Sequence, residues 1–216
     1  MLDRFTWFKQ AAYLWRGENK NIYIDPWGVT EGQPPADVIF LTHAHEDHFS
    51  QEDLERVTRA ETIVVAPRDI AQELNGEVQA VAPGDSGEVA GVKFQAVPAY
   101  NVVEDRLEMH PKANNWVGYI LTLGDSTYYH AGDTDHAPEL ESVRADVAFV
   151  PIGGTYTMDI REAAGFVKVL QPQLAVPMHY GFFPGVGKAS DGEDFRAAAD
   201  PIKVEVLTPE NPFANE

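Results

Sequence analysis

Any fold of this chain must accommodate a strand that runs directly into a cluster of metal-binding side chains. The apolar segment Val38–Leu41 is followed at once by Thr42-His43-Ala44-His45-Glu46-Asp47-His48. Alternate side chains of an extended chain point to the same side, so His43 and His45 project together. A turn would then bring Asp47 and His48 to a second point nearby. Three imidazoles and a carboxylate at this spacing indicate a metal site rather than a solvated polar loop.

The rest of the chain has short apolar segments separated by Pro and Gly. These segments predict strands over residues 22–24, 62–66, 93–97, 117–123, 127–130, 147–150, 174–176 and 204–207. Ser50 is a suitable N-cap for a helix after the histidine cluster, and Asp159 with Glu162 predicts a helix that ends near Leu170. A short helix is expected over residues 193–199. Strands that alternate with capped helices indicate a layered α/β protein.

Composition narrows the class of function. The 216 residues suit a single domain over 1–216, and 16 basic against 34 acidic residues give a net charge of −18. That balance argues against nucleic-acid binding and suits a small-molecule substrate. The chain has no cysteine, so nitrogen and oxygen atoms must hold any metal. Without an apolar leader or membrane-length segment, we expect a cytoplasmic protein that does not bind membranes; its oligomeric state stays open.

Two later segments place metal-binding residues just after predicted strands. Asp133 follows the strand predicted over 127–130, and the small residues Ala131 and Gly132 permit a tight turn before it. His179 follows the strand predicted over 174–176 in the same way. Each is a metal-binding residue type just beyond a strand end, and could supply ligands that the first cluster lacks.

Together these residues make the sequence resemble the metallo-β-lactamase fold superfamily over nearly the whole chain. Residues 43–48 match its H-x-H-x-D-H motif, Asp133 its metal-bridging Asp, His179 its final ligand and Asp25 an early structural Asp. The segments His-Ala-Gly-Asp-Thr, Pro-Ile-Gly-Gly-Thr-Tyr-Thr-Met and Pro-Met-His-Tyr resemble a narrower branch of metal-dependent hydrolases near ascorbate-6-phosphate lactonase. The resemblance implies a four-layer αββα sandwich with its site at one edge between the sheets.

The resemblance also implies two divalent metal ions, with zinc favoured and manganese or iron as alternatives. One ion would be held by His43, His45 and a third histidine. The other would be held by Asp47, His48 and His179, and Asp133 would bridge the two.

The third histidine of the first metal is not at its usual place in the sequence. Many members of the superfamily carry it directly after the strand that corresponds to residues 93–97, where this chain has Pro98-Ala99-Tyr100-Asn101. We predict that the later loop folds back and presents His110, because three protein nitrogens and an open position are usual in catalytic sites. His130 is the alternative, although packing or a hydrogen bond to a ligand explains it better.

This arrangement predicts a metal-dependent hydrolase for a small ester, lactone or phosphodiester. A hydroxide that bridges the metals, held by Asp133, would attack the substrate, and Asp47 would orient or carry the proton. Tyr156 and Tyr180 are candidate donors to the substrate oxygen, or packing residues. The alternatives are a nucleic-acid phosphodiesterase, which the net charge opposes, iron redox chemistry, which usually needs a flavin domain, and a non-catalytic metal-binding protein.

Overall fold

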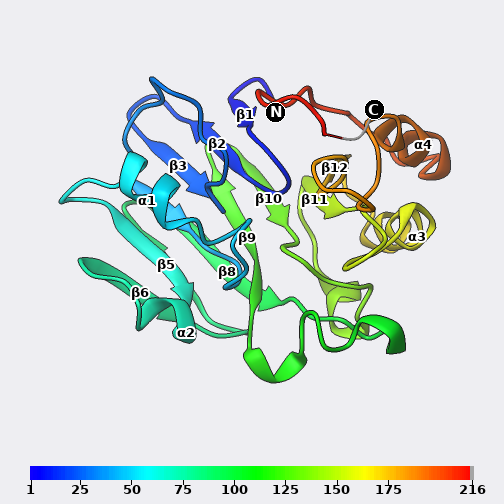
Figure 1. Cartoon of the computed structure of the whole chain (residues 1–216), viewed down its shortest axis with the longest axis horizontal. Coiled ribbons are helices and arrows are strands. Elements are labelled where there is room, and N and C mark those ends of the chain that lie inside the picture. The colour runs from blue at the N-terminus through cyan, green and yellow to red at the C-terminus, as the bar shows by residue number, and fades with distance from the viewer. Residues whose placement is uncertain (215–216) are drawn as a thin grey trace.

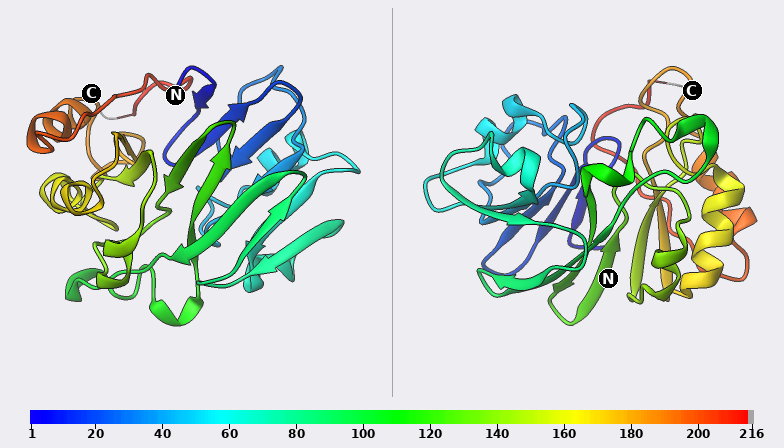
Figure 2. Two further views of the ribbon diagram at one scale, coloured as in Figure 1. Left: turned by 180° about the vertical axis from the view of Figure 1, so that it is seen from behind. Right: turned by 90° about the horizontal axis from the view of Figure 1, so that it is seen from below.

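Two six-stranded sheets stack face to face in the computed structural model, which describes residues 1–214 (Figures 1 and 2). The first sheet contains, in spatial order, β1 (Phe5–Trp7), β2 (Tyr13–Arg16), β3 (Asn21–Ile24), β4 (Val38–Phe40), β5 (Ile63–Pro67) and β6 (Glu77–Val81). The second contains β12 (Leu174–Met178), β11 (Val147–Pro151), β10 (Ser126–His130), β9 (Val117–Leu123), β8 (Val92–Pro98) and β7 (Ser86–Val89).

Each sheet combines antiparallel and parallel pairs. In the first sheet β1 to β3 are antiparallel and β3 to β6 are parallel. In the second, β7 to β10 are antiparallel and β10 to β12 are parallel. Parallel neighbours end on the same side of their sheet, so the loops that follow β3, β4, β10 and β12 can come together.

Helices cover the outer surface of each sheet. On the first sheet, α1 (Gln51–Val57) and α2 (Arg68–Ala71) bury Leu54, Val57 and Ile70 in an outer core. On the second, α3 (Ile160–Leu170) and α4 (Asp191–Ala198) lie beside β11 and β12 (Figure 1). Short 3-10 helices are η1 (Glu104–Arg106), η2 (Lys112–Asn114) and η3 (Pro138–Ser142). The predicted layered αββα architecture is confirmed.

The aromatic core between the sheets fixes their separation. The ring of Phe40 in the first sheet lies 5.8 Å from Phe94 and 5.1 Å from Tyr119 in the second. Tyr119 also donates a 2.8 Å hydrogen bond from its hydroxyl to the carbonyl of Leu41, directly before the histidine cluster. The second sheet therefore holds the start of the cluster in place.

The strands predicted between residues 22 and 176 are present, whereas β1, β2, β6 and the short helix α2 have no predicted counterpart. Two of the predicted elements differ from the structure. Residues 204–207 form no strand; only Val204 bridges to Ala175, beside the edge strand β12. Pro209 soon follows, and a residue without a backbone N–H cannot extend the pairing. The last helix begins at Asp191, earlier than predicted. The helix start at Asp159 is confirmed, with the reciprocal hydrogen bonds to Glu162 of a capping box.

Within residues 1–214, no helix is both long and apolar enough to cross a bilayer.

Candidate metal centre

The histidine cluster turns sharply after β4. Backbone N–H groups of His48 and Phe49 both donate to the carbonyl of His45, at 2.9 and 2.8 Å. This turn brings the ring of His48 to 4.0 Å from the ring of His43. Ser50 then caps α1 by accepting the N–H of Asp53. The cap and the turn together direct the histidines away from the helix and toward the edge of the sheets.

Asp25, directly after β3, accepts hydrogen bonds from residues on both sides of this turn. Its carboxylate is fully buried and accepts the Thr42 N–H at 2.8 Å, the Thr42 hydroxyl at 2.6 Å and His48 Nδ1 at 2.8 Å. Because a carboxylate only accepts, His48 must carry a hydrogen on Nδ1. Nε2, whose lone pair binds a metal once its proton is lost, is therefore the nitrogen that faces the site.

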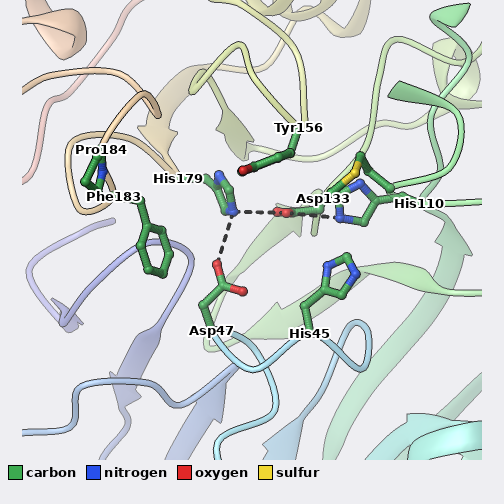
Figure 3. Close-up of a pocket in the computed structure, with 9 residues that line it drawn as sticks. His45, Asp47, His110, Asp133, Tyr156, His179, Phe183 and Pro184 are labelled. Atoms are coloured by element: carbon green, nitrogen blue, oxygen red, sulfur yellow. Dashed lines mark ion pairs between the residues drawn. The ribbon is translucent and has the colours of Figure 1, made fainter. Parts of the chain in front are cut away.

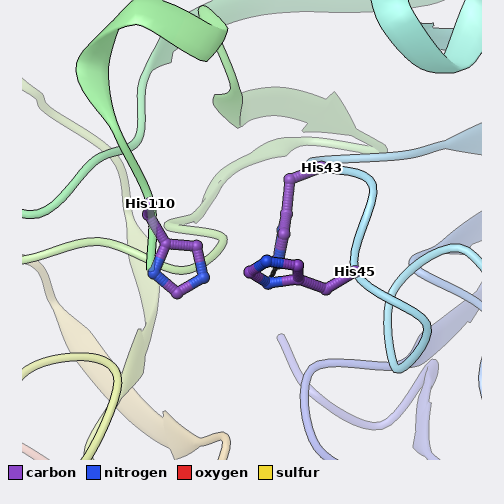
Figure 4. Close-up of side chains that lie close together, drawn as sticks. All are labelled: His43, His45 and His110. Atoms are coloured by element: carbon purple, nitrogen blue, oxygen red, sulfur yellow. Dashed lines mark hydrogen bonds between the residues drawn. The ribbon is translucent and has the colours of Figure 1, made fainter. Parts of the chain in front are cut away.

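His43, His45 and His110 form a triad of nitrogens on one side of the site (Figure 4). Their candidate ligand atoms all lie within 4.8 Å of one another. The loop that carries His110 folds back because Asn101 binds it twice. Asn101 donates its N–H to the His110 carbonyl at 2.9 Å, and its Oδ1 lies 2.8 Å from His110 Nδ1. The structure thus brings His110 to the position that we predicted for the third histidine.

His130 lies outside this triad. Its Nε2 donates to the carbonyl of Ala11 at 2.9 Å, and its Nδ1 accepts the N–H of Gly132 at 3.3 Å. The ring also packs against Tyr13 and Phe149. Because both ring nitrogens are engaged with the backbone, His130 serves packing and not ligation in this structure.

A second group contains Asp47, His48 and His179, whose candidate ligand atoms also lie within 4.8 Å of one another. Asp133 lies between the two groups (Figure 3). Its Oδ2 is 3.0 Å from His179 Nε2 and 3.3 Å from His110 Nε2, and its Oδ1 is 3.5 Å from His48 Nε2. One carboxylate therefore contacts residues of both groups, as a bridging ligand would.

The donor atoms fit divalent metal ions. His48 Nε2, His110 Nε2 and Asp133 Oδ1 are buried and have no well-aligned hydrogen bond within residues 1–214. Leaving such an atom unpaired typically costs about 1–3 kcal/mol. All three atoms face the same small space, and neutral imidazole with carboxylate suits zinc, manganese and iron. Together these features make the cluster capable of binding metal.

The buried histidines and carboxylates of the site shift one another's pKa values. Burial opposes the charge on His48, but nearby carboxylates, Asp133 first, raise its pKa to about 9. Burial likewise opposes the charge on His179, whose pKa Asp133 and Asp47 raise to about 10. Burial also disfavours the Asp133 carboxylate, yet His179 and His48 hold its pKa well below its usual range. For His43, burial and then His48 lower the pKa well below its usual range. Metal ions would replace protons on His48 and His179.

Two residues of the site, Asn101 and Gln10, were not predicted as functional from the sequence. Asn101 was noted only as part of the segment that lacks the usual histidine. Gln10 lies in the turn between β1 and β2, and its Nε2 is 3.3 Å from Asp47 Oδ2 and 3.2 Å from His179 Nε2. A lone glutamine in a turn carries no motif, so no sequence signal could have identified Gln10.

A buried ion pair fixes the loop that presents His110. Arg106 donates from Nε to Asp135 at 2.7 Å, and from one terminal nitrogen to both oxygens of Glu162 at 2.7 and 2.9 Å. The second oxygen of Asp135 accepts the N–H groups of Val102 and Val103. The start of the His110 loop is therefore tied to both the Asp133 turn and α3.

The metal-binding groups open into a cavity of about 360 Å³. Apart from them, its wall contains Met109, Tyr156, Phe183 and Pro184 (Figure 3). The volume is within the range of about 300–1,000 Å³ typical of small-molecule sites. Tyr156 therefore lines the cavity together with the candidate ligands. Tyr180 does not line this cavity, because its ring is buried against Trp7 and Phe213.

Known proteins of similar sequence are named metal-dependent hydrolases. Residues 4–179 match the family model of the beta-lactamase superfamily domain. A UPF0173 metal-dependent hydrolase of Methanopyrus kandleri is 30% identical over 223 residues, covering 94% of each chain. One of Pyrococcus horikoshii is 35% identical over 218 residues, covering 92% of this chain and 93% of the relative.

A solved structure extends the likeness to three dimensions. Igni18, a metallo hydrolase of the hyperthermophilic archaeon Ignicoccus hospitalis, superposes with a TM-score of 0.77 at 26% identity. The match covers 96% of this chain and 95% of Igni18. With its αββα fold and its cluster of histidines and aspartates, the chain belongs to the metallo-β-lactamase superfamily, among the UPF0173 metal-dependent hydrolases.

Proposed function

We propose that the protein hydrolyses a small ester or lactone with two divalent metal ions, and that zinc is the preferred ion. The observation that carries the proposal is the position of Asp133, whose two oxygens contact both groups of candidate ligands at the floor of the cavity. His43, His45 and His110 would hold one ion, and Asp47, His48 and His179 the other. Three nitrogens suit zinc at the first position.

When bound, such a pair of ions supplies Lewis acidity and lowers the pKa of water toward ~7. The protein's own residues hold the candidate ligands in place and orient their rings. Asp133 fixes the spacing of the two groups, and Asn101 and Asp25 fix the ring orientations of His110 and His48. Rigid orientation of this kind is what sustains catalytic efficiency at metal sites.

Asp47 is suited to orient the attacking water. It is half-buried, lines the cavity and contacts His179 at 3.5 Å through Oδ2. Burial would disfavour its carboxylate, but His48 and then His179 keep its pKa below its usual range. A carboxylate that stays ionised accepts a hydrogen bond from water throughout the neutral range and does not store the proton for long.

The wall of the cavity supports a substrate with an apolar flank. Met109, Phe183 and Pro184 give an apolar surface beside the metal-binding groups, and Tyr156 offers a hydroxyl. Neither Lys nor Arg is among the described residues that line the cavity. Apart from the proposed metal ions, no cationic side chain among the described lining residues would bind the charge of a phosphodiester, which favours an ester or lactone.

A substrate screen tests the proposal. Metal-free protein is loaded with zinc or manganese and offered chromogenic carboxylic esters, lactones and phosphodiesters. We expect turnover of an ester or lactone that disappears with chelator and falls at least about a thousandfold in Asp133→Ala. Preferential cleavage of phosphodiesters, or of RNA with strong salt sensitivity, would contradict the proposal.

A further inference from the structure

The amide of Gln10 reaches the second group of candidate ligands, although no motif includes this residue. Gln10 is fully buried. Its Nε2 lies 3.3 Å from Asp47 Oδ2 and 3.2 Å from His179 Nε2. These two atoms belong to the group that would hold the second metal. The end of the Gln10 side chain is therefore within hydrogen-bonding distance of two members of this group.

The spacing is that of ligands around one ion. Two donor atoms bound to the same metal at about 2.0–2.2 Å lie about 3.0–3.5 Å apart. Asp47 Oδ2 lies 3.5 Å from His179 Nε2 and 3.6 Å from His48 Nε2. The amide of Gln10 thus approaches its neighbours as closely as these atoms approach one another.

The hydrogen bonds of the amide are poorly satisfied in its present orientation. Gln10 Oε1 is buried without a partner among residues 1–214, while Nε2 faces the ring nitrogen of His179. Once His179 Nε2 gives its lone pair to a metal, it cannot accept a hydrogen from Gln10. Rotation of the amide exchanges its oxygen and nitrogen at almost no change in shape. The carbonyl oxygen, unlike the nitrogen, is a metal ligand.

The backbone holds Gln10 in place for this contact. Its φ of 43° lies in the left-handed region, which residues other than Gly, Asn and Asp seldom adopt. Its carbonyl accepts the Trp7 indole N–H at 2.9 Å and the His179 N–H at 3.0 Å. The turn and the loop that carries His179 are therefore joined directly. A strained residue that persists at such a point is typical of a functional site.

We propose that Gln10 is a further ligand of the second metal through its side-chain carbonyl oxygen. The inference rests on the proposed two-metal site and adds a neutral oxygen donor to it. Carbonyl and carboxylate oxygens suit manganese better than soft ligands do. The second position should consequently bind manganese more tightly than Asp47, His48 and His179 alone would allow.

Two substitutions separate a ligand from a hydrogen-bond donor. Gln10→Asn tolerates the left-handed backbone but shortens the side chain out of reach. Gln10→Glu keeps the length and offers only oxygen, so it can bind metal but cannot donate to Asp47. Manganese binding to metal-free protein is measured by competition with a chromophoric chelator, for the first and second equivalents separately. Thermal unfolding of each metal-free variant checks its fold.

We expect Gln10→Asn to weaken the affinity for the second equivalent of manganese by about tenfold or more, and to leave the affinity for the first unchanged. Gln10→Glu should bind the second equivalent at least as tightly as the wild type does. A smaller loss in Gln10→Asn, or a Gln10→Glu variant as weak as Gln10→Asn, would overturn the inference. If the wild-type protein takes up no second equivalent, the proposed two-metal function fails together with this inference. If the wild-type protein binds two equivalents of manganese and neither substitution changes the affinity for the second, only the proposed role of Gln10 is refuted.

Discussion

Asp25 offers a sharp test of how the site is built, because it contacts no candidate metal position itself. Its carboxylate determines which nitrogen of His48 carries the hydrogen. In Asp25→Asn an NH₂ group replaces one oxygen at nearly the same size. If that group faces His48, the ring must accept at Nδ1 and carry its hydrogen on Nε2. The nitrogen that faces the site then has no lone pair for a metal.

The size of the effect follows from these contacts. Loss of a hydrogen bond that orients a metal-binding histidine typically weakens affinity about 10–100-fold, or about 1.4–2.7 kcal/mol. The fold also loses a hydrogen bond to a charged group, worth about 1.5–3 kcal/mol. We therefore expect Asp25→Asn to bind its second zinc ion about 10–100-fold more weakly. The free energy of unfolding of the metal-free protein should fall by about 2 kcal/mol.

Competition with a chromophoric chelator measures the zinc affinities, and denaturant unfolding of metal-free protein measures stability. The matched control is Asp146→Asn, at a residue that directly precedes β11 and is bonded to Thr127 near the start of β10, at the end of the strand away from Asp133. Asp146 accepts the N–H and the hydroxyl of Thr127, both at 2.8 Å, but contacts no histidine. The control should leave both zinc affinities unchanged. Wild-type affinity for both equivalents in Asp25→Asn would refute the argument that Asp25 sets the His48 tautomer.

Three other results are expected. The raised pKa values of His48 and His179, about 9 and 10, stabilise the metal-free fold fully below pH ~6.5. That stabilisation should be lost as pH rises through 9 to 10, as unfolding at several pH values would show. Arg106→Met should weaken the first zinc equivalent at least about threefold, measured by chelator competition, because the loop that presents His110 loses its anchor. Tyr156→Phe should lower kcat about 10-fold or more without changing metal content; unchanged kcat would assign the tyrosine to packing.

Site residues can be predicted from the sequence where their positions depend on local spacing. The motif at residues 43–48 follows a strand and precedes a cap, so its geometry is largely set by neighbours in the chain. Asp133 and His179 also follow strands directly, and both lie at the predicted edge. The predicted strands between residues 22 and 176 follow local pattern in the same way, whereas β1, β2 and β6 were not predicted. The strand predicted over residues 204–207 is wrong, because pairing there depends on β12, which is distant in the sequence.

Long-range contacts account for what the sequence could not provide. His110 reaches the site only because Asn101 and the Arg106–Asp135 pair fold its loop back. Gln10 reaches it because β1 and β2 lie beside the loop of His179. No local pattern encodes either approach, since each depends on how separate elements pack.

The claim of a two-metal centre is tested most directly by anomalous X-ray diffraction from crystals of the zinc-loaded protein. We expect two anomalous peaks about 3.5–4 Å apart, one beside His43, His45 and His110 and the other beside His48 and His179. The carboxylate of Asp133 should lie between them. A single peak at full occupancy, or peaks away from Asp133, would contradict it.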